Sequence, residues 1–118
     1  MAAFARTARL TRPGEFRRVF AKAERSTGRA LTVLFAANDL DRPRLGLALS
    51  RKAVGRSVDR NRIKRITRES FRLHQDALGG RDIVILARSG AAEVPRRALW
   101  AELEQHWKRL KRSLCAPS

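Results

Sequence analysis

Nine basic side chains crowd the segment from residue 51 to residue 72, and no other part of the sequence offers so clear a chemistry. The net charge of this segment is 9 − 2 = +7, a large share of the +16 carried by all 118 residues. Charge this dense repels itself and opposes folding unless a polyanion neutralises it, so nucleic acid is the favoured partner. The basic residues are Arg51, Lys52, Arg56, Arg60, Arg62, Lys64, Arg65, Arg68 and Arg72, and the acids are Asp59 and Glu69.

The part of this segment that begins at Arg60 has the period of an amphipathic helix. At about 100° per residue, its basic side chains fall on one arc and its apolar side chains on the opposite arc. A solvated helix normally mixes acids and bases for pairing four residues apart, whereas Glu69 is the only acid between Arg60 and Leu73. We therefore predict a phosphate-binding surface, to which the guanidinium fork is well suited. The arc expected to be buried holds Ile63, Ile66, Ser70 and Leu73.

Two groups of polar and aromatic residues leave alternatives open. Asn61 lies within the cationic arc, where its amide is either simply solvated or bonds a base edge or a 2′-hydroxyl. Phe16 and Phe20, four residues apart, are either core residues or an aromatic floor for unpaired bases. On the last helix we expect Trp107 in the core and leave Trp100 open.

Protein-based catalysis finds little support. His74 and His106 are the only histidines, and neither is followed by a metal-type partner at the third or fourth position after it, which argues against a zinc site. The eleven carboxylates are dispersed, so no acidic cluster suits two-metal phosphoryl chemistry. No nucleophile elbow or phosphate loop is present. We predict no catalytic residue and no metal-binding residue, so if the chain takes part in a reaction, we expect another molecule to supply the reacting groups.

Helices are expected over residues 13–23, 60–75 and 96–113, with Asp59 or Ser57 capping the second. Strands are expected over 30–37, 44–50 and 82–87. The last strand is apolar throughout and is predicted to be covered on both faces. One face of the middle strand has only small side chains or none, so a helix or a ligand backbone must approach it closely. That face holds Gly46, Ala48 and Ser50.

Length and composition indicate one domain spanning residues 1–118, with short tails at 1–8 and 114–118 expected to be flexible. The basic start of the chain fits such a tail better than an organellar transit peptide. No apolar run approaches the 18 or so residues of a membrane span. Cys115 is the only cysteine, which excludes a disulfide within the chain and favours a reducing compartment, so we expect a cytoplasmic protein.

Residues 60–72, RNRIKRITRESFR, resemble the protein subunit of bacterial ribonuclease P. That family has an Arg-Asn-Arg motif continuing as Ile-Lys-Arg, preceded by Arg-Leu-Gly-Leu, which here is residues 44–47. The family's Ser-Lys-Lys is here Ser-Arg-Lys at 50–52, a departure that bears on contact strength. A second departure is the absence of an aromatic residue near Val33 or Leu34. The first helix and the strand at 82–88 also fit, so the resemblance covers about residues 9–112.

The resemblance implies an α+β protein, a two-layer α/β sandwich of order α-β-β-β-α-β-α, like domain 2 of ribosomal protein S5. It adds a short strand near residues 24–29 and a left-handed β-α-β crossover, which defies the usual preference. It also implies a division of labour in which a catalytic RNA with associated Mg²⁺ removes the 5′ leader of precursor tRNA. The protein would bind no metal through its side chains alone, and no membrane or protein partner is expected.

Carried over by position, one set of residues would face RNA and another would line a cleft for the leader. The RNA-facing set is Arg60, Asn61, Arg62, Lys64, Arg65 and Arg68, and the cleft set is Phe16, Phe20, Ser50, Lys52 and Arg88. The main rival is a small ribosomal-type protein that only scaffolds RNA, since it would share the charge and size. A duplex-DNA binder with a helix in the major groove and a protein-only nuclease are further rivals.

Overall fold

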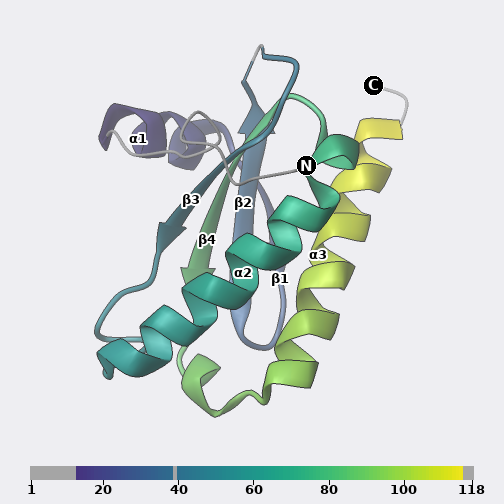
Figure 1. Ribbon diagram of the computed structural model, residues 1–118. Coiled ribbons are helices and arrows are strands. Elements are labelled where there is room, and N and C mark those ends of the chain that lie inside the picture. The colour runs from purple at the N-terminus through teal and green to yellow at the C-terminus, as the bar shows by residue number, and fades with distance from the viewer. Residues whose placement is uncertain (1–12, 39, 116–118) are drawn as a thin grey trace.

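The computed structural model describes residues 13–38 and 40–115, and it consists of a four-stranded sheet with helices on both faces (Figure 1). The expected α+β sandwich and its order are confirmed. In chain order the elements are α1 (Pro13–Lys22), β1 (Glu24–Thr27), β2 (Leu31–Ala37), β3 (Arg44–Ala48), α2 (Ser57–Leu78), β4 (Arg81–Ala87), the 3-10 turn η2 (Ala91–Glu93) and α3 (Arg96–Cys115).

The strands lie in the order β1-β2-β4-β3. β2 is antiparallel to both β1 and β4, whereas β3 is parallel to β4. In Figure 1, β3 and β4 both run downwards with β3 on the left, and α2 returns upwards in front of them. This connection is the left-handed crossover that the resemblance implied, against the usual right-handed rule.

The two faces of the sheet bury different helices. On β2, Leu31, Val33 and Phe35 point into the main core under α2 and α3. Because successive side chains alternate between faces, Leu34 points the other way and packs with Val19 of α1. β4 is buried on both faces, as its continuous apolar run predicted.

Several element boundaries differ from those expected. α2 begins and ends three residues beyond the predicted limits, so Ser57 and Asp59 lie in its first turn rather than at its cap. The N-cap is Arg56, which makes no side-chain capping bond. The middle strand ends at Ala48, so Ser50 follows the strand instead of belonging to it. α3 continues to Cys115, so residues 114 and 115 of the expected C-terminal tail are helical, while the N-terminal tail and 116–118 lie outside the described residues.

Gly79 and Gly80 end α2 and form the turn into β4, as their pairing predicted. Gly79 has a φ of 68°, which strains any residue with a side chain. A Cβ on Gly80 would lie 1.9 Å from the carbonyl oxygen of Leu40, so the turn packs directly beneath the connection between β2 and β3. The helix is thereby stopped at a defined place relative to the sheet.

An ion pair joins the parallel strands near their first residues. Arg44 donates from Nε and Nη2 to the two carboxylate oxygens of Asp82, each at 2.8 Å. Asn38 Nδ2 donates to the same carboxylate at 3.0 Å. Asp82 is only 2% exposed, so its charge depends on these donors in place of water.

We expect Asp82→Ala to lower the free energy of unfolding by roughly 1.5–3 kcal/mol, because it removes a charged acceptor from a largely buried arginine. Urea unfolding followed by circular dichroism measures the change. Asp76→Ala, at an exposed position near the end of α2, is the control and should change the free energy by less than about 0.5 kcal/mol. Equal effects of the two substitutions would contradict the role given to Asp82.

Candidate nucleic-acid interface

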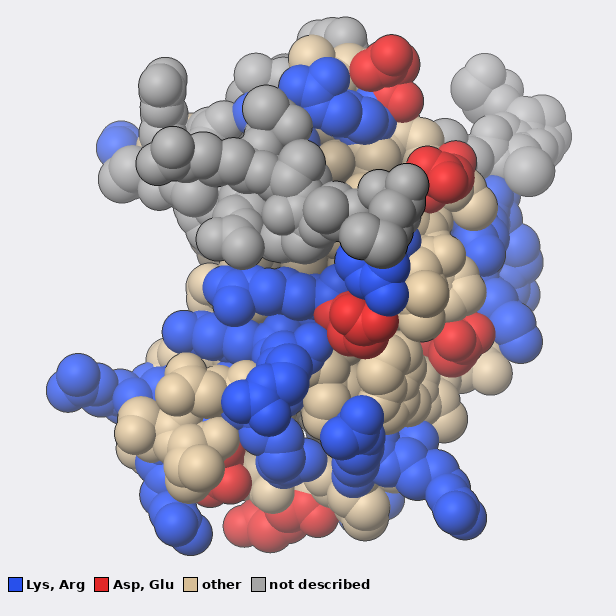
Figure 2. Space-filling view, in the orientation of Figure 1, with Lys and Arg blue, Asp and Glu red and all other residues tan. Residues whose placement is uncertain are grey.

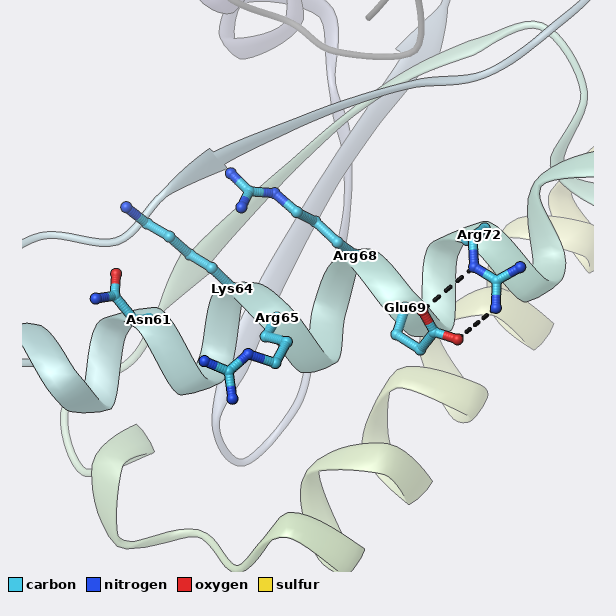
Figure 3. A pocket seen from close by; sticks show the side chains of 6 residues that line it. All are labelled: Asn61, Lys64, Arg65, Arg68, Glu69 and Arg72. Atoms are coloured by element: carbon cyan, nitrogen blue, oxygen red, sulfur yellow. Dashed lines mark hydrogen bonds and ion pairs between the residues drawn. The ribbon is translucent and has the colours of Figure 1, made fainter. Parts of the chain in front are cut away.

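The exposed side of α2 carries an open hollow of about 400 Å³ (Figure 3). In Figure 3, Lys64 and Arg68 extend from the helix towards the β3 side, and Arg65 extends towards the opposite side. On the face of the molecule that Figure 2 shows, lysine and arginine side chains gather over α2, and acidic side chains are fewer and scattered. The hollow is lined by Asn61, Lys64, Arg65, Arg68, Glu69 and Arg72.

The buried arc of α2 explains why these side chains face solvent together. Taking Arg60 as zero, the buried side chains lie between about 240° and about 20° on the helical wheel, and the lining residues lie between about 40° and 180°. Phe71, at about 20°, is fully buried, whereas Leu73, predicted to be buried, is 61% exposed. The buried arc is therefore shifted by a few tens of degrees from the predicted one, because it gains Phe71 and loses Leu73. The buried residues are Ile63, Ile66, Thr67, Ser70, Phe71 and Leu78.

Arg60 and Arg62 of the predicted RNA-facing set donate hydrogen bonds to backbone carbonyl groups of the protein itself. Arg60 Nη1 donates to the carbonyl oxygens of Val54 and Gly55, at 2.9 and 3.0 Å. Arg62 Nη2 donates to the carbonyl oxygen of Ala92 at 3.0 Å, at the start of the segment leading into α3. These acceptors carry no net charge, so both arginines still contribute a full positive charge to the surface.

A single acid lies among the basic side chains that line the hollow. Glu69 pairs with Arg72, which donates from Nε at 3.2 Å and also from Nη2 (Figure 3). The hydrogen bond from Arg72, which is half-buried, lowers the pKa of the exposed Glu69. Within residues 13–38 and 40–115, no hydrogen bond or ion pair is made by Lys64 or Arg65. The lining of the hollow keeps a formal charge of 4 − 1 = +3.

The predicted cleft residues are distributed over two parts of the fold. Ser50, Lys52 and Arg88 follow the parallel strands β3 and β4, so the topology places them at the same end of the sheet. Ser50 Oγ accepts a hydrogen bond from the backbone N–H of Ala53 at 3.1 Å, and Arg88 donates to the carbonyl oxygen of Gly28 at 2.5 Å.

The aromatic pair is on α1. Phe20 is 49% exposed, and the side chain of Phe16 lies outside the described side chains. The bare face of β3 is partly accounted for by α1, since Ala48 packs against the cluster that contains Val19. A closely packed helix thus occupies some of this face, and the exposed Phe20 is carried by that same helix.

Three comparisons with known proteins point to one family. The Ribonuclease P family model matches residues 4–111. The ribonuclease P protein component of Methylococcus capsulatus is 54% identical over 109 residues, covering 92% of this chain and 85% of the relative. That of Nitrosococcus oceani is 50% identical over 104 residues, covering 88% and 87%. The chain belongs to the ribonuclease P protein family.

The solved ribonuclease P protein of Staphylococcus aureus superposes with a TM-score of 0.81 at 31% identity, covering 88% of this chain and 95% of that one. The family membership decides against the ribosomal scaffold and the duplex-DNA binder, and it makes the chain the protein subunit of ribonuclease P, an endoribonuclease complex.

Arg72 lines the hollow but was not in the predicted RNA-facing set. Its position four residues after Arg68 places it on the same side of the helix and could have indicated it.

A buried Ser-His-Glu chain in this ribonuclease P protein has the order of a hydrolase triad, and sequence spacing did not reveal it. Ser26 Oγ lies 2.7 Å from His106 Nδ1, and His106 Nε2 lies 2.9 Å from Glu102. Ser26 is only 4% exposed, and its Oγ already accepts a hydrogen bond from Arg109 at 2.9 Å. A substrate cannot reach a hydroxyl so enclosed. These three side chains therefore have a structural role, and Ser26 is not a nucleophile.

The same network docks α3 on the start of β2. The two carboxylate oxygens of Glu102 accept the backbone N–H groups of Ala30 and Leu31, both at 2.8 Å. Burial alone would raise the pKa of Glu102, but the hydrogen bonds from His106 and from these two N–H groups outweigh it and lower the pKa. No group of three or more His, Cys, Asp or Glu side chains suited to a metal ion, and no helix able to span a membrane, occurs in the described part of the chain.

We expect Glu102 to contribute stability that is lost in acid. Because its pKa is lower in the folded chain than in the unfolded chain, the contribution is complete above the unfolded value near 4.3 and disappears as the pH falls through the folded value. Glu102→Gln should therefore be less stable at neutral pH by about 1–3 kcal/mol, and the gap should narrow between about pH 5 and pH 3.

Urea unfolding at several pH values provides the measurement. Glu93→Gln, which changes an exposed glutamate in η2, is the matched control and should follow the parent curve at every pH. A constant difference between Glu102→Gln and the parent from pH 7 to pH 3 would show that the carboxylate charge is irrelevant.

Proposed function

We propose that the basic side of α2 binds the RNA subunit of ribonuclease P and that the chain helps this RNA to remove the 5′ leader of precursor tRNA. The observation that carries the proposal is the lining of the α2 hollow, where four basic side chains meet one glutamate. Charges of one sign held together on a rigid helix bind a phosphate backbone without needing to be reorganised. Guanidinium groups add bidentate phosphate contacts, which a lysine cannot make.

In this proposal the RNA subunit, with its associated Mg²⁺, performs the hydrolysis. The chain supports such a division because its only triad-like cluster among described residues is closed to substrate. The protein then acts by neutralising phosphates, which lets RNA segments that repel one another approach more closely. Cleavage by the chain freed of all RNA is not expected.

We place the leader of precursor tRNA near α1 and the carboxyl ends of β3 and β4. Phe20 supports this assignment because a phenylalanine 49% exposed on a helix supplies a stacking surface for unpaired bases. Lys52 and Arg88 are exposed and add positive charge at that end of the sheet. Together they suit a single-stranded, sequence-tolerant ligand.

Lys64→Ala and Arg65→Ala should each weaken binding of the in-vitro transcribed ribonuclease P RNA. Each removes a cation that makes no described hydrogen bond or ion pair within the protein, so binding should weaken while the unfolding free energy stays unchanged. The slope of log affinity against log salt should fall by about 0.7–0.9 for each phosphate that is no longer neutralised. Filter binding at several salt concentrations measures both quantities.

Lys108→Ala is the matched control, because Lys108 is exposed on α3 and lines no hollow described beside α2. It removes the same charge from the chain but should keep most of the affinity and the parent slope. If Lys64→Ala, Arg65→Ala and Lys108→Ala behave alike, net charge alone explains binding and α2 is not the interface.

Phe20→Ala should weaken binding of precursor tRNA that has a leader more than it weakens binding of mature tRNA, which has none. A stacked base contributes about 1–3 kcal/mol, so binding of the leader-bearing substrate should weaken by roughly 5- to 150-fold. Affinities of the reconstituted complex for leader-bearing and leaderless tRNA provide the comparison. An equal effect on both tRNAs would place Phe20 outside the leader path.

A further inference from the structure

A second hollow, of about 380 Å³, lies on the other side of α2, where this helix meets α3. Its lining combines two apolar side chains, Ile66 and Trp100, which we call its floor, with charged ones, whereas every residue that lines the first hollow is polar or charged. Arg65 and Glu69 line both hollows, so the two are adjacent across the ridge of one helix. The second hollow is lined by Arg62, Arg65, Ile66, Glu69, Arg96 and Trp100.

Trp100 is built into this hollow differently from the other tryptophan of the chain. Trp107 is fully buried, and its indole N–H donates to Ser70 Oγ at 2.8 Å. Trp100 is half-buried: it packs against the main core and also lines the hollow. Its indole N–H makes no hydrogen bond within the described residues. Together with Ile66, it offers a flat apolar surface with an available donor.

The charges around this floor favour an anion. Three arginines and one glutamate give a formal charge of 3 − 1 = +2. Arg62 is anchored by backbone carbonyl groups, and Glu69 is already paired with Arg72. In the described chain, Arg65 and Arg96 make no hydrogen bond or ion pair, so both remain able to bind a phosphate.

We propose that this hollow receives an unpaired nucleotide of the RNA subunit, with its base stacked on Trp100 and its phosphate bound by Arg65 and Arg96. The inference rests on the proposed function and extends it from phosphate contact to base contact. A nucleotide combines a π face with an adjacent negative charge, which matches an indole beside two guanidinium groups. An acidic peptide matches the charge but not the flat aromatic floor.

The first test uses Trp100→Leu and Trp100→Phe with the in-vitro transcribed ribonuclease P RNA. RNA should quench the tryptophan fluorescence of the parent, and the quenching should disappear in both variants, which keep only Trp107. Trp100→Leu should bind about 5- to 150-fold more weakly, because it cannot stack a base. Trp100→Phe keeps an aromatic face and should recover most of the affinity. Thermal unfolding of each variant shows that it is folded.

The second test separates the phosphate from the base. Arg96→Ala should lower the salt slope of binding by about 0.7–0.9, whereas Trp100→Leu should leave the slope unchanged. Arg97→Ala is the matched control, since Arg97 is the next residue of α3, is exposed and does not line the hollow. It should keep the parent slope.

Two results would overturn the inference. One is that folded Trp100→Leu binds the RNA with the affinity of the parent; the other is that polyglutamate quenches the tryptophan fluorescence of the parent and the RNA does not. Lys64 lines only the first hollow, so Lys64→Ala tells the two proposals apart. If Lys64→Ala weakens binding while Trp100→Leu does not, this inference fails alone, and if neither does, the proposed function fails with it.

Discussion

The packing of one side of α2 is the constraint on which the rest of the structure depends. Ile63 and Phe71 have no exposed surface, and Phe71 meets Trp107 of α3 edge-on, with ring centroids 6.2 Å apart. Burial of such side chains contributes about 1.5–3 kcal/mol each, which offsets the repulsion among like charges on the opposite side of the helix. The core therefore holds together a row of cations that solvent alone would not align.

The same packing determines where the two hollows lie. Ser70 receives the indole N–H of Trp107 at 2.8 Å, which fixes α3 against the buried side of α2. Behind it, Glu102 and His106 fasten α3 to the start of β2 through a buried polar network. With α3 held on both sides, Trp100 comes to lie beside Ile66 at the edge of the core. The second hollow is thus a consequence of helix packing.

The helical period of residues 60–74 was readable from the sequence because burial and charge both repeat with the same period. Phe71 and Leu73 were the exceptions, since only the position of α3 decides which of two neighbouring apolar residues is covered. The strand at Glu24–Thr27 has a single buried residue and no alternating pattern to mark it. Its buried residue, Ser26, meets His106 eighty positions later, and no local spacing reveals such a contact.

The arginines of α2 divide into those that hold the fold and those that face outwards, and the division could not be read from residue type. Arg60 and Arg62 bind neutral carbonyl groups of neighbouring segments, so they stabilise these segments and still add charge to the surface. A carboxylate partner would have cancelled that charge. Because charges are felt over about 8–10 Å at physiological salt, these two arginines add to the positive potential around Lys64 and Arg65. The motif thereby anchors the loops around α2 and strengthens the field in which Lys64 and Arg65 act.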